Sequence, residues 1–444
     1  MSRNRKKRLS AEPVCVTVET LAHDGRGVTR VNEKTVFIDG ALPGEEVMFK
    51  YVATHRNYDE GVVDEVLTAS PDRVQPRCPH YGICGACSFQ HLASEQQIVV
   101  KQKVLMDDLR HIGKVMPAEV LPPLTGPHWG YRRKARLGVR WVAKKDKLLV
   151  GFREKRSNFL ADLSRCENLH PSVGQRLAEL GALVRRLEAY DQIPQIEVAV
   201  DDTQTALVFR HMVPLSDADR ERLHDYAQAQ DLRVFLQPGG TETIAPLWPE
   251  HIQLGYSLPA FDVSFRFEPS DFTQVNTDIN RAMVERALGL LDLKPEERVL
   301  DLFCGLGNFT LPIARRAASV VGVEGSADLV KRARENAERN GIGNATFHAA
   351  DLAADLSHAP WWQGGFDKVL LDPPRSGAQE TLAHLAKLKV GRIVYVSCNP
   401  ATLARDAGVL VNEHGYTLQK AGVMDMFPHT AHVESIALFT RKRR

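Results

Sequence analysis

The residue types best suited to chemistry gather in the C-terminal third of the chain. The segment Asp372–Arg375 (sequence DPPR) follows one expected strand, and Cys398 follows the next. Because the carboxyl ends of parallel strands meet at one edge of a sheet, we expect Asp372 and Cys398 to lie close together. An expected helix begins just after Cys398, and the dipole at a helix start favours a thiolate. Glu434, just before the last expected strand, is a candidate general base.

A reactive cysteine near a carboxylate suits methylation of carbon 5 of uracil, which is a poor nucleophile by itself. A thiolate that adds to C6 turns the ring into an enolate, and C5 can then attack the methyl group of a sulfonium cofactor. A base must next remove the C5 proton so that the cysteine can leave. Cys398 and Glu434 could fill these two roles.

Other interpretations stay open from the residues alone. Methyltransferases that act on exocyclic amines also place an acid or asparagine before Pro-Pro, but an aromatic residue normally follows where this chain has Arg375. Such an enzyme would not need Cys398. A free cysteine is also commonly a small buried hydrophobic residue, a role that we assign to Cys304.

A candidate cofactor loop lies at Asp301–Phe309 (DLFCGLGNF), between an expected strand and an expected helix, where glycines let the backbone approach a ligand closely. The loop lacks the third glycine of G-x-G-x-x-G, and this favours S-adenosylmethionine over a dinucleotide. Glu324, 19 residues after Gly305, ends the next strand, where a carboxylate can accept both ribose hydroxyls. Asp351 ends the third strand, where it can reach the adenine amino group.

From about residue 296 onward, expected strands alternate with expected helices. This rhythm predicts an α/β, Rossmann-like methyltransferase domain with a doubly wound, mostly parallel sheet. The expected strands are Val299–Phe303, Val320–Val323, Phe347–Ala350, Lys368–Leu371, Ile393–Val396, Thr417–Met426 and Ser435–Thr440, and the expected helices are Leu311–Ala317, Ala327–Asn340, Gln379–Leu388 and Ala401–Glu413.

Three separated motifs, Asp372–Gly377, Ile393–Thr402 and Asp425–Glu434, resemble the signatures of the RNA uracil-5-methyltransferase family. The resemblance implies that Cys398 is the nucleophile and Glu434 the base. It also implies cofactor contacts from Gln274, Phe303, Asn308, Glu324, Asp351 and Asp372. From their position in the sequence, we expect His429 and His432 to brace the loop before Glu434 rather than to act in catalysis.

A cysteine cluster, Cys78-x5-Cys84-x2-Cys87, encloses small residues that allow tight wrapping around a metal centre. Cys166, the only other cysteine before Cys304, is the natural fourth ligand. Four thiolates fit either structural zinc or an iron–sulfur cluster. The family resemblance implies a [4Fe–4S] cluster in the ribosomal RNA branch, and we expect it to have a structural or RNA-positioning role. An RNA-binding iron–sulfur protein without transferase activity is the alternative from another class.

The N-terminal part alternates short β-rich runs with turns, namely Val14–Leu21, Gly27–Val31, Thr35–Ile38, Glu46–Val52 and Gly61–Leu67. Five short strands at this spacing predict an OB-like barrel, which resembles a TRAM domain. We expect a basic disordered tail at residues 1–10, the barrel at 11–70, a central β-rich RNA-binding domain with the iron–sulfur cysteines at 71–267, and the methyltransferase domain at 268–444. Helices are expected at Ser94–Ile112 and Gly174–Glu188.

The segment His128–Arg156 is basic with interleaved aromatic residues, which is typical of single-stranded RNA binding. The family resemblance implies 23S ribosomal RNA as the target, with the uridine flipped into the site. A barrel together with four cysteines is expected of the ribosomal RNA branch, whereas the transfer RNA branch is expected to lack both. The alternative is a dual-site 23S or transfer RNA enzyme. No apolar run reaches the length of a membrane span, and the start of the chain lacks the apolar region of a signal peptide, so we expect a cytoplasmic monomer.

Overall fold

The computed structural model describes residues 12–354 and 356–441, so the basic tail expected at residues 1–10 lies outside the described part of the chain. The chain divides into two compact units. Unit 1 comprises the chain up to Lys101 together with Glu154–Ser157 and Phe427–His432, and unit 2 comprises the remainder. None of the helices within the described ranges combines the length and the apolar character that crossing a lipid bilayer requires.

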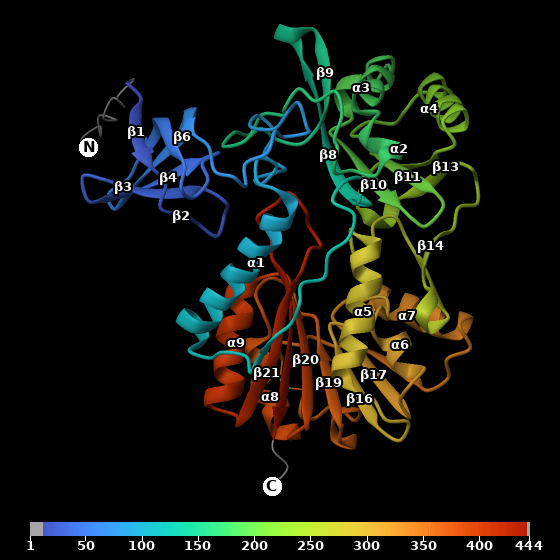
Figure 1. The fold of residues 1–444 in the computed structure, drawn as a ribbon. Helices are drawn as coiled ribbons and strands as arrows, with labels where there is room; N and C mark the ends of the chain where they lie inside the picture. Colours follow the sequence, from blue (N-terminus) through green and yellow to red (C-terminus); the bar gives the residue numbers. More distant parts are fainter. Residues whose placement is uncertain (1–11, 355, 442–444) are drawn as a thin grey trace, which may run out of the picture. The chain divides into compact units, whose positions relative to one another are not determined.

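Unit 1 begins with a sheet of six strands in the order β1-β5-β6-β4-β3-β2 (Figure 1). The strands are β1 (Val14–Thr17), β2 (Thr20–Leu21), β3 (Gly27–Val31), β4 (Lys34–Asp39), β5 (Glu46–Thr54) and β6 (Tyr58–Thr68). Their inward-facing residues, including Val36, Ile38, Val47 and Phe49, form a buried core. The first expected strand is in fact two strands, because β1 pairs with β5 whereas β2 pairs with β3.

Helix α1 (Ser94–Asp108) continues into a π-helical turn at Leu109–Gly113, close to the expected bounds. The turn ends at Lys114, which adopts a left-handed conformation with φ 55°. A Cβ on Gly113 would collide with the carbonyl oxygen of Ala404 in helix α9 (Pro400–Asn412). Glycine at position 113 therefore lets the turn pack directly against the backbone of α9.

The middle of the chain in unit 2 forms a second six-stranded sheet in the order β13-β12-β11-β10-β8-β9, an order that the sequence pattern could not supply. Its strands are β8 (Lys134–Val142), β9 (Lys147–Gly151), β10 (Gln195–Val200), β11 (Thr205–Arg210), β12 (Arg233–Gln237) and β13 (Ala245–Trp248). Helices α2 (Pro171–Gly174), α3 (Leu177–Arg185) and α4 (Asp217–Ala229) lie along the same stretch of chain, and β14 (Leu254–Leu258) pairs with β15 (Val263–Phe267) as a separate hairpin.

The third sheet has eight strands in the order β18-β17-β16-β19-β20-β22-β21-β7. The strands are β7 (Glu119–Val120), β16 (Arg298–Leu302), β17 (Ser319–Glu324), β18 (Ala345–Ala349), β19 (Lys368–Leu371), β20 (Arg392–Ser397), β21 (Tyr416–Met424) and β22 (Glu434–Arg441). Neighbours from β18 to β20 are parallel and β22 is antiparallel to both of its neighbours. The predicted doubly wound, mostly parallel sheet is therefore confirmed.

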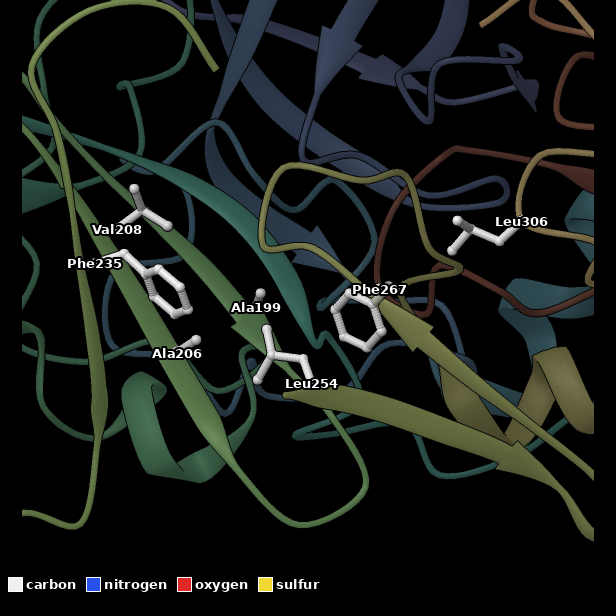
Figure 2. Packing of buried hydrophobic residues seen from close by; sticks show 7 residues of the cluster. All are labelled: Ala199, Ala206, Val208, Phe235, Leu254, Phe267 and Leu306. Carbon is white, nitrogen blue, oxygen red and sulfur yellow. The ribbon is translucent and has the colours of Figure 1, made fainter. Parts of the chain in front are cut away.

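Helices α5 (Thr277–Leu291), α6 (Thr310–Ala314), α7 (Ala327–Arg339), α8 (Gln379–Leu388) and α9 alternate with these strands (Figure 1). Most match the expected helices within a few residues, whereas α5 was not expected. A buried apolar cluster joins the second sheet, the β14–β15 hairpin and the cofactor loop (Figure 2). Its members are Ala199, Ala206, Val208, Phe235, Leu254, Phe267 and Leu306.

Candidate active site

Cys398 and Glu434 are brought together by the antiparallel pairing of β20 and β22. The register pairs Ser397 with Ser435, and Ser435 Oγ donates a hydrogen bond to the carbonyl oxygen of Ser397 at 3.0 Å. Cys398 directly follows this pair on one side and Glu434 directly precedes it on the other, and the two side chains lie near enough for Glu434 to raise the pKa of the Cys398 thiol. Cys398 is half-buried, and Glu434 is only 3% exposed. The thiol and the carboxyl group are therefore both at least partly shielded from solvent.

The loop after Cys398 is tied to the Asp372–Arg375 segment. Asn399 caps α9, where its Oδ1 accepts a hydrogen bond from the N–H of Ala401 at 3.2 Å. Its Nδ2 donates to the carbonyl oxygen of Arg375 at 3.0 Å. Asp372 directly follows β19, the parallel neighbour of β20. The structure thus places Asp372, Cys398 and Glu434 together at the ends of three adjacent strands.

Burial at this site favours the protonated forms of Cys398 and Glu434. Burial raises the pKa of the Cys398 thiol to about 11, with Glu434 and Asp372 adding to the rise and the Arg375 guanidinium opposing it. Burial also raises the pKa of Glu434 well above its ordinary range, with Asp372 adding to this. It raises the pKa of Asp372 to about 7. Burial and the two carboxyl groups therefore act on the pKa of the Cys398 thiol in the direction opposite to the effect expected of the helix start.

The cofactor loop begins with two unusual backbone conformations. Phe303 has φ 65° and Gly305 has φ 53°. A bulky residue in the left-handed region is rare, and such conformations concentrate where a loop holds a ligand. No heavy atom lies within 4 Å of a Cβ built on Gly305, so the loop backbone faces open space at this point.

Glu324 ends β17, as expected, and points back to the cofactor loop. Its Oε2 accepts a hydrogen bond from the N–H of Gly305 at 3.2 Å, and its Oε1 accepts one from the N–H of Ser326 at 3.0 Å. Asp351, in contrast, lies two residues beyond the end of β18 and is exposed. Its Oδ1 accepts a hydrogen bond from the N–H of Ala353 at 3.0 Å.

Asn308 and Gln274 are linked through residues that sequence reasoning missed. Asn308 Oδ1 accepts hydrogen bonds from Tyr256 Oη at 3.0 Å and from Asn280 Nδ2 at 3.2 Å. Gln274 lines a pocket that Tyr256 and Asn280 also line, together with Arg133, Val200, Asp201, Phe267, Thr273 and Thr277. Tyr256 lies in a hairpin before the methyltransferase pattern begins, and no spacing rule connects it to the loop.

Asp301, at the start of the cofactor loop, is a further missed residue. It is fully buried, and its Oδ2 accepts a hydrogen bond from the Thr310 hydroxyl. Burial raises the pKa of Asp301 to about 8; the Thr310 hydrogen bond opposes this, whereas Asp372 and Glu324 add to it.

The segment Phe427–His432, which leads into Glu434, belongs to unit 1. His429 is buried, with φ 65°, and its carbonyl oxygen accepts hydrogen bonds from the N–H groups of Ser88 and Phe89, both at 3.0 Å. Its own N–H donates to Gln97 Oε1 at 2.8 Å. His429 thus fixes the segment, as expected, whereas His432 is exposed.

Three of the four expected metal ligands, Cys78, Cys84 and Cys87, lie in unit 1, and Cys166 lies in unit 2. Burial raises the pKa of Cys84, while a hydrogen bond from the N–H of Ala86 lowers it and the neighbouring Cys78 raises it. Within residues 12–354 and 356–441, no three Cys, His, Asp or Glu side chains are arranged as a ready metal site. The chemistry of the donors, small residues wrapped closely around thiols, fits a thiolate-bound centre.

The basic segment His128–Arg156 is not one uniform exposed face. Tyr131 is only 5% exposed. Lys134 Nζ donates to the carbonyl oxygens of Pro269 and Asp271, and burial lowers its pKa to about 8. Arg140, by contrast, is exposed.

Trp141 of this segment makes a cation–π contact with an arginine from another part of the chain. The Arg185 guanidinium of α3 lies 4.5 Å from the ring centroids of both Trp141 and Tyr190. Trp141 is half-buried and its ring is contacted by a cation from α3, so RNA binding by this segment stays a prediction.

Comparisons with known proteins agree with this geometry. The profile of the tRNA (uracil-5-)-methyltransferase family matches residues 201–442, and that of the TRAM domain matches residues 12–63. The 23S rRNA (uracil(1939)-C(5))-methyltransferase RlmD of Xanthomonas campestris pv. campestris is 55% identical over 445 residues, which cover 100% of both chains. The enzyme of the same name from Alkalilimnicola ehrlichii is 56% identical over 439 residues, 99% of each chain.

This chain belongs to the RNA uracil-5-methyltransferase family. It is an S-adenosylmethionine-dependent enzyme that methylates carbon 5 of uracil in RNA. The expected family, reaction and TRAM domain are therefore confirmed.

Among solved structures, the Pyrococcus abyssi tRNA (uracil-54, C5)-methyltransferase in complex with S-adenosyl-L-homocysteine aligns with a TM-score of 0.75 over 96% of this chain and 100% of that chain. At 24% identity this likeness shows the fold alone. The alignment leaves only a small part of this chain uncovered, and the barrel is much longer than that part. The aligned transfer RNA enzyme therefore shares the barrel. The expectation that transfer RNA enzymes lack the barrel is therefore wrong, and architecture does not identify the RNA target.

Proposed function

We propose that this chain methylates carbon 5 of uracil 1939 in 23S ribosomal RNA. The support is the near-complete coverage and the 55% and 56% identity of relatives named for that reaction. The barrel and the mostly parallel sheet fit the same enzyme but fit other RNA targets equally well. The proposed RNA target is therefore supported by sequence identity, and the proposed chemistry is supported by the arrangement of the site residues.

Cys398 is proposed as the nucleophile and Glu434 as the general base. The Cys398 thiol passes its proton to water as Sγ bonds to C6, and the electron pair of the C5–C6 double bond moves onto the ring as an enolate. C5 then bonds to the methyl carbon of S-adenosylmethionine, whose S–CH3 bond breaks, and S-adenosylhomocysteine leaves. Glu434 removes the C5 proton, the C5–C6 double bond re-forms, and the S–C6 bond breaks. The placement of Cys398 and Glu434 directly beyond the last pair of the β20–β22 ladder is the observation that carries this proposal.

The burial of Glu434 suits the proposed role. A carboxyl group whose pKa is raised by desolvation is a stronger base, once ionised, than an exposed carboxylate. The raised pKa of Cys398 means that its proton must leave as the RNA binds or as the S–C6 bond forms. Arg375, which lowers the pKa of this thiol, is placed to assist that loss.

The proposed cofactor site comprises Gln274, Phe303, Asn308, Glu324, Asp351 and Asp372. The open space at Gly305 and the anchored carboxylate of Glu324 fit an adenosyl group. When bound, S-adenosylmethionine supplies an electrophilic methyl group on its sulfonium. Glu324 would accept the ribose hydroxyls, and Asp351 would need to turn away from Ala353 to reach the adenine.

We also propose that Cys78, Cys84, Cys87 and Cys166 hold a [4Fe–4S] cluster. Iron and sulfide measured on protein purified without oxygen should fall together in Cys84→Ser, while Cys15→Ser, which changes an exposed cysteine outside the set, should leave both unchanged. Zinc bound in place of iron and sulfide would overturn this assignment. A structural or RNA-positioning role predicts that a cluster-free variant loses activity on ribosomal RNA, and full activity would contradict that role.

The proposed domain division assigns residues 11–70 to the barrel, 71–267 to the central RNA-binding domain and 268–444 to catalysis. We propose that the enzyme acts as a monomer on a flipped uridine.

The exposed charges around Trp141 would neutralise phosphates while the ring stacks on bases. Replacing Arg140 by alanine should weaken RNA binding and lower its salt dependence by about one unit of slope. An unchanged slope would remove Arg140 from the RNA surface.

The target is tested by incubating the protein with labelled S-adenosylmethionine and fragments of 23S RNA or unmodified transfer RNA, then mapping the modified base. We expect one methyl group, on C5 of uracil 1939. A second labelled uracil in 23S RNA, or efficient labelling of transfer RNA, would overturn the single-site assignment. A methyl group on an exocyclic amine would overturn the proposed chemistry.

A further inference from the structure

We infer that Tyr256 and Asn280 are positioning residues that orient Asn308 toward the cofactor. The inference rests on the proposed contact between Asn308 and S-adenosylmethionine. Tyr256 comes from β14 and Asn280 from the first turn of α5. Two elements outside the cofactor loop therefore converge on one side-chain amide within it.

The amides of Asn308 and Asn280 form a reciprocal pair. Asn308 Nδ2 donates to Asn280 Oδ1 at 2.9 Å, and Asn280 Nδ2 donates to Asn308 Oδ1 at 3.2 Å. Tyr256 Oη donates to the same Asn308 Oδ1 at 3.0 Å. A primary amide carries two N–H donors, and this pair uses one of those on Asn308. The plane of the Asn308 amide is therefore fixed, and its second N–H has a set direction in which to meet a ligand.

Tyr256 and Asn280 are themselves held firmly. The ring of Tyr256 stacks on that of its cross-strand partner Phe265, with a centroid distance of 4.7 Å and an interplanar angle of 13°. Burial raises the pKa of Tyr256, so its hydroxyl keeps the proton that it donates. Asn280 is only 4% exposed. Neither side chain has much freedom to follow Asn308 if that residue moves.

The hairpin that carries Tyr256 is anchored on both strands. Backbone N–H groups of β15 donate to Asn336 Oδ1 and Asn340 Oδ1 of α7, at 2.9 and 2.8 Å. Leu254 and Phe267 of the hairpin belong to the same buried cluster as Leu306, two residues before Asn308 (Figure 2). An anchored hairpin can thus impose an orientation on the amide, which is what a positioning role requires.

The network also borders space for a ligand. Tyr256, Asn280 and the expected cofactor residue Gln274 line one pocket, with Thr273 and Thr277 beside them. Asn308 is not itself one of the residues that line this pocket. Tyr256 and Asn280 connect it to the place where Gln274 would meet the same cofactor.

The test measures binding of S-adenosylhomocysteine to the full-length protein by calorimetry. Tyr256→Phe keeps the ring stack and removes one hydrogen bond, so we expect affinity to fall about three- to tenfold. Asn280→Ala removes the reciprocal pair and should cost about tenfold or more. Tyr416→Phe is the matched control, because its hydroxyl also donates one hydrogen bond, to the carbonyl oxygen of Val390 at 3.0 Å, away from the loop. It should leave the affinity unchanged.

Steady-state kinetics separate positioning from folding. Tyr256→Phe should raise the KM for S-adenosylmethionine and leave the KM for RNA unchanged, whereas a general folding defect would alter both. The double variant Tyr256→Phe/Asn308→Ala should bind S-adenosylhomocysteine no more weakly than Asn308→Ala alone. Additive losses would overturn the inference.

Binding by Asn308→Ala distinguishes the cofactor contact of Asn308 from its positioning by Tyr256 and Asn280. If Asn308→Ala binds S-adenosylhomocysteine as tightly as the unmodified protein, the proposed cofactor contact of Asn308 is wrong. If Asn308→Ala weakens binding but Tyr256→Phe and Asn280→Ala do not, the contact stands and the positioning inference falls.

Discussion

Cys398 directly follows, and Glu434 directly precedes, the last pair of the antiparallel β20–β22 ladder, Ser397 with Ser435. The proposed reaction needs both Cys398 and Glu434, because C6 and C5 of uracil are bonded neighbours and each must meet one of the two side chains. Parallel strands alone would supply the cysteine and Asp372 but not Glu434. The antiparallel insertion of β22 beside β20 is therefore the topological feature that completes the site.

Replacing Glu434 by glutamine should trap the reaction after methyl transfer. The amide keeps the shape of the side chain but cannot take the C5 proton, so the S–C6 bond cannot be eliminated. We expect methylated RNA to accumulate as a covalent adduct, with turnover reduced by roughly a hundredfold or more. The adduct would be seen as a labelled band of RNA and protein on a denaturing gel. Normal turnover of Glu434→Gln would remove Glu434 from the base role.

Arg375 should control how readily Cys398 ionises. The guanidinium favours the thiolate, so Arg375→Ala should raise the pKa of Cys398 further above its value of about 11. Below that pH the alkylation rate follows the thiolate fraction, so at pH 8 iodoacetamide should modify Cys398 roughly two- to fivefold more slowly in Arg375→Ala. Arg375→Lys keeps the charge and should react nearly as fast as the unmodified protein. The rate is followed by mass spectrometry on the peptide that contains Cys398, and faster alkylation of Arg375→Ala would contradict this electrostatic role.

Asp301 should make the protein less stable as the pH rises. The pKa of Asp301 is about 8 in the folded protein, above the value of about 4 for an unfolded aspartate. Its contribution to stability is therefore fully present below about pH 4 and is lost as the pH rises through about 8. Asp301→Asn removes this titration, so its melting temperature relative to the unmodified protein should be higher at pH 8.5 than at pH 5.

The exposed Asp262 provides the control for this pH effect, since its side chain is fully exposed and its ion partner Arg315 stays charged at both pH values. Asp262→Asn should change the melting temperature similarly at pH 5 and pH 8.5. If the difference in melting temperature between Asp301→Asn and the unmodified protein were the same at pH 5 and pH 8.5, the raised pKa of Asp301 would be wrong.

Gln97 should hold the segment that leads into Glu434. Its Nε2 donates to the carbonyl oxygens of Phe89 and Leu92, at 3.1 and 2.8 Å, and its Oε1 accepts the N–H of His429. Gln97→Ala leaves these buried groups without that partner, which should cost about 1–3 kcal/mol of unfolding free energy. Hydrogen exchange should become faster in Phe427–His432.

Gln96→Ala is the matched control, because Gln96 is the neighbouring residue on the same helix and is only half-buried. It should leave exchange in Phe427–His432 unchanged. Equal exchange in the two variants would show that Gln97 does not hold this segment.

Much of the catalytic sheet could be predicted from the sequence, because buried parallel strands are short apolar runs separated by helical patterns. Lys368–Leu371 and Gln379–Leu388 match their expected bounds fully. Helix α5 was missed, since its start at Thr277 follows a polar loop and its pattern merges with the next segment. The strand order of the second sheet depends on long-range pairing, such as that of β8 with β10. The local pattern of apolar and polar residues does not reveal which strands pair.

The candidate site shows the same limit. Cys398, Glu324 and Asp372 follow strands and could be found by position. Tyr256 and Asn280 were missed because they reach Asn308 only through tertiary packing. The raised pKa of the Cys398 thiol could not be predicted, because a helix start is visible in sequence, whereas desolvation and the proximity of Glu434 are not.

The central claim is that Cys398 bonds to the pyrimidine ring, and the most direct measurement uses a fragment of 23S RNA with 5-fluorouracil at position 1939. Fluorine at C5 cannot leave as a proton, so the adduct should persist after S-adenosylmethionine is added. We expect mass spectrometry to locate the RNA on the peptide that contains Cys398, and Cys398→Ala to give no adduct while still binding S-adenosylhomocysteine. Absence of any adduct in the unmodified protein, under conditions where it methylates the normal RNA, would contradict the account.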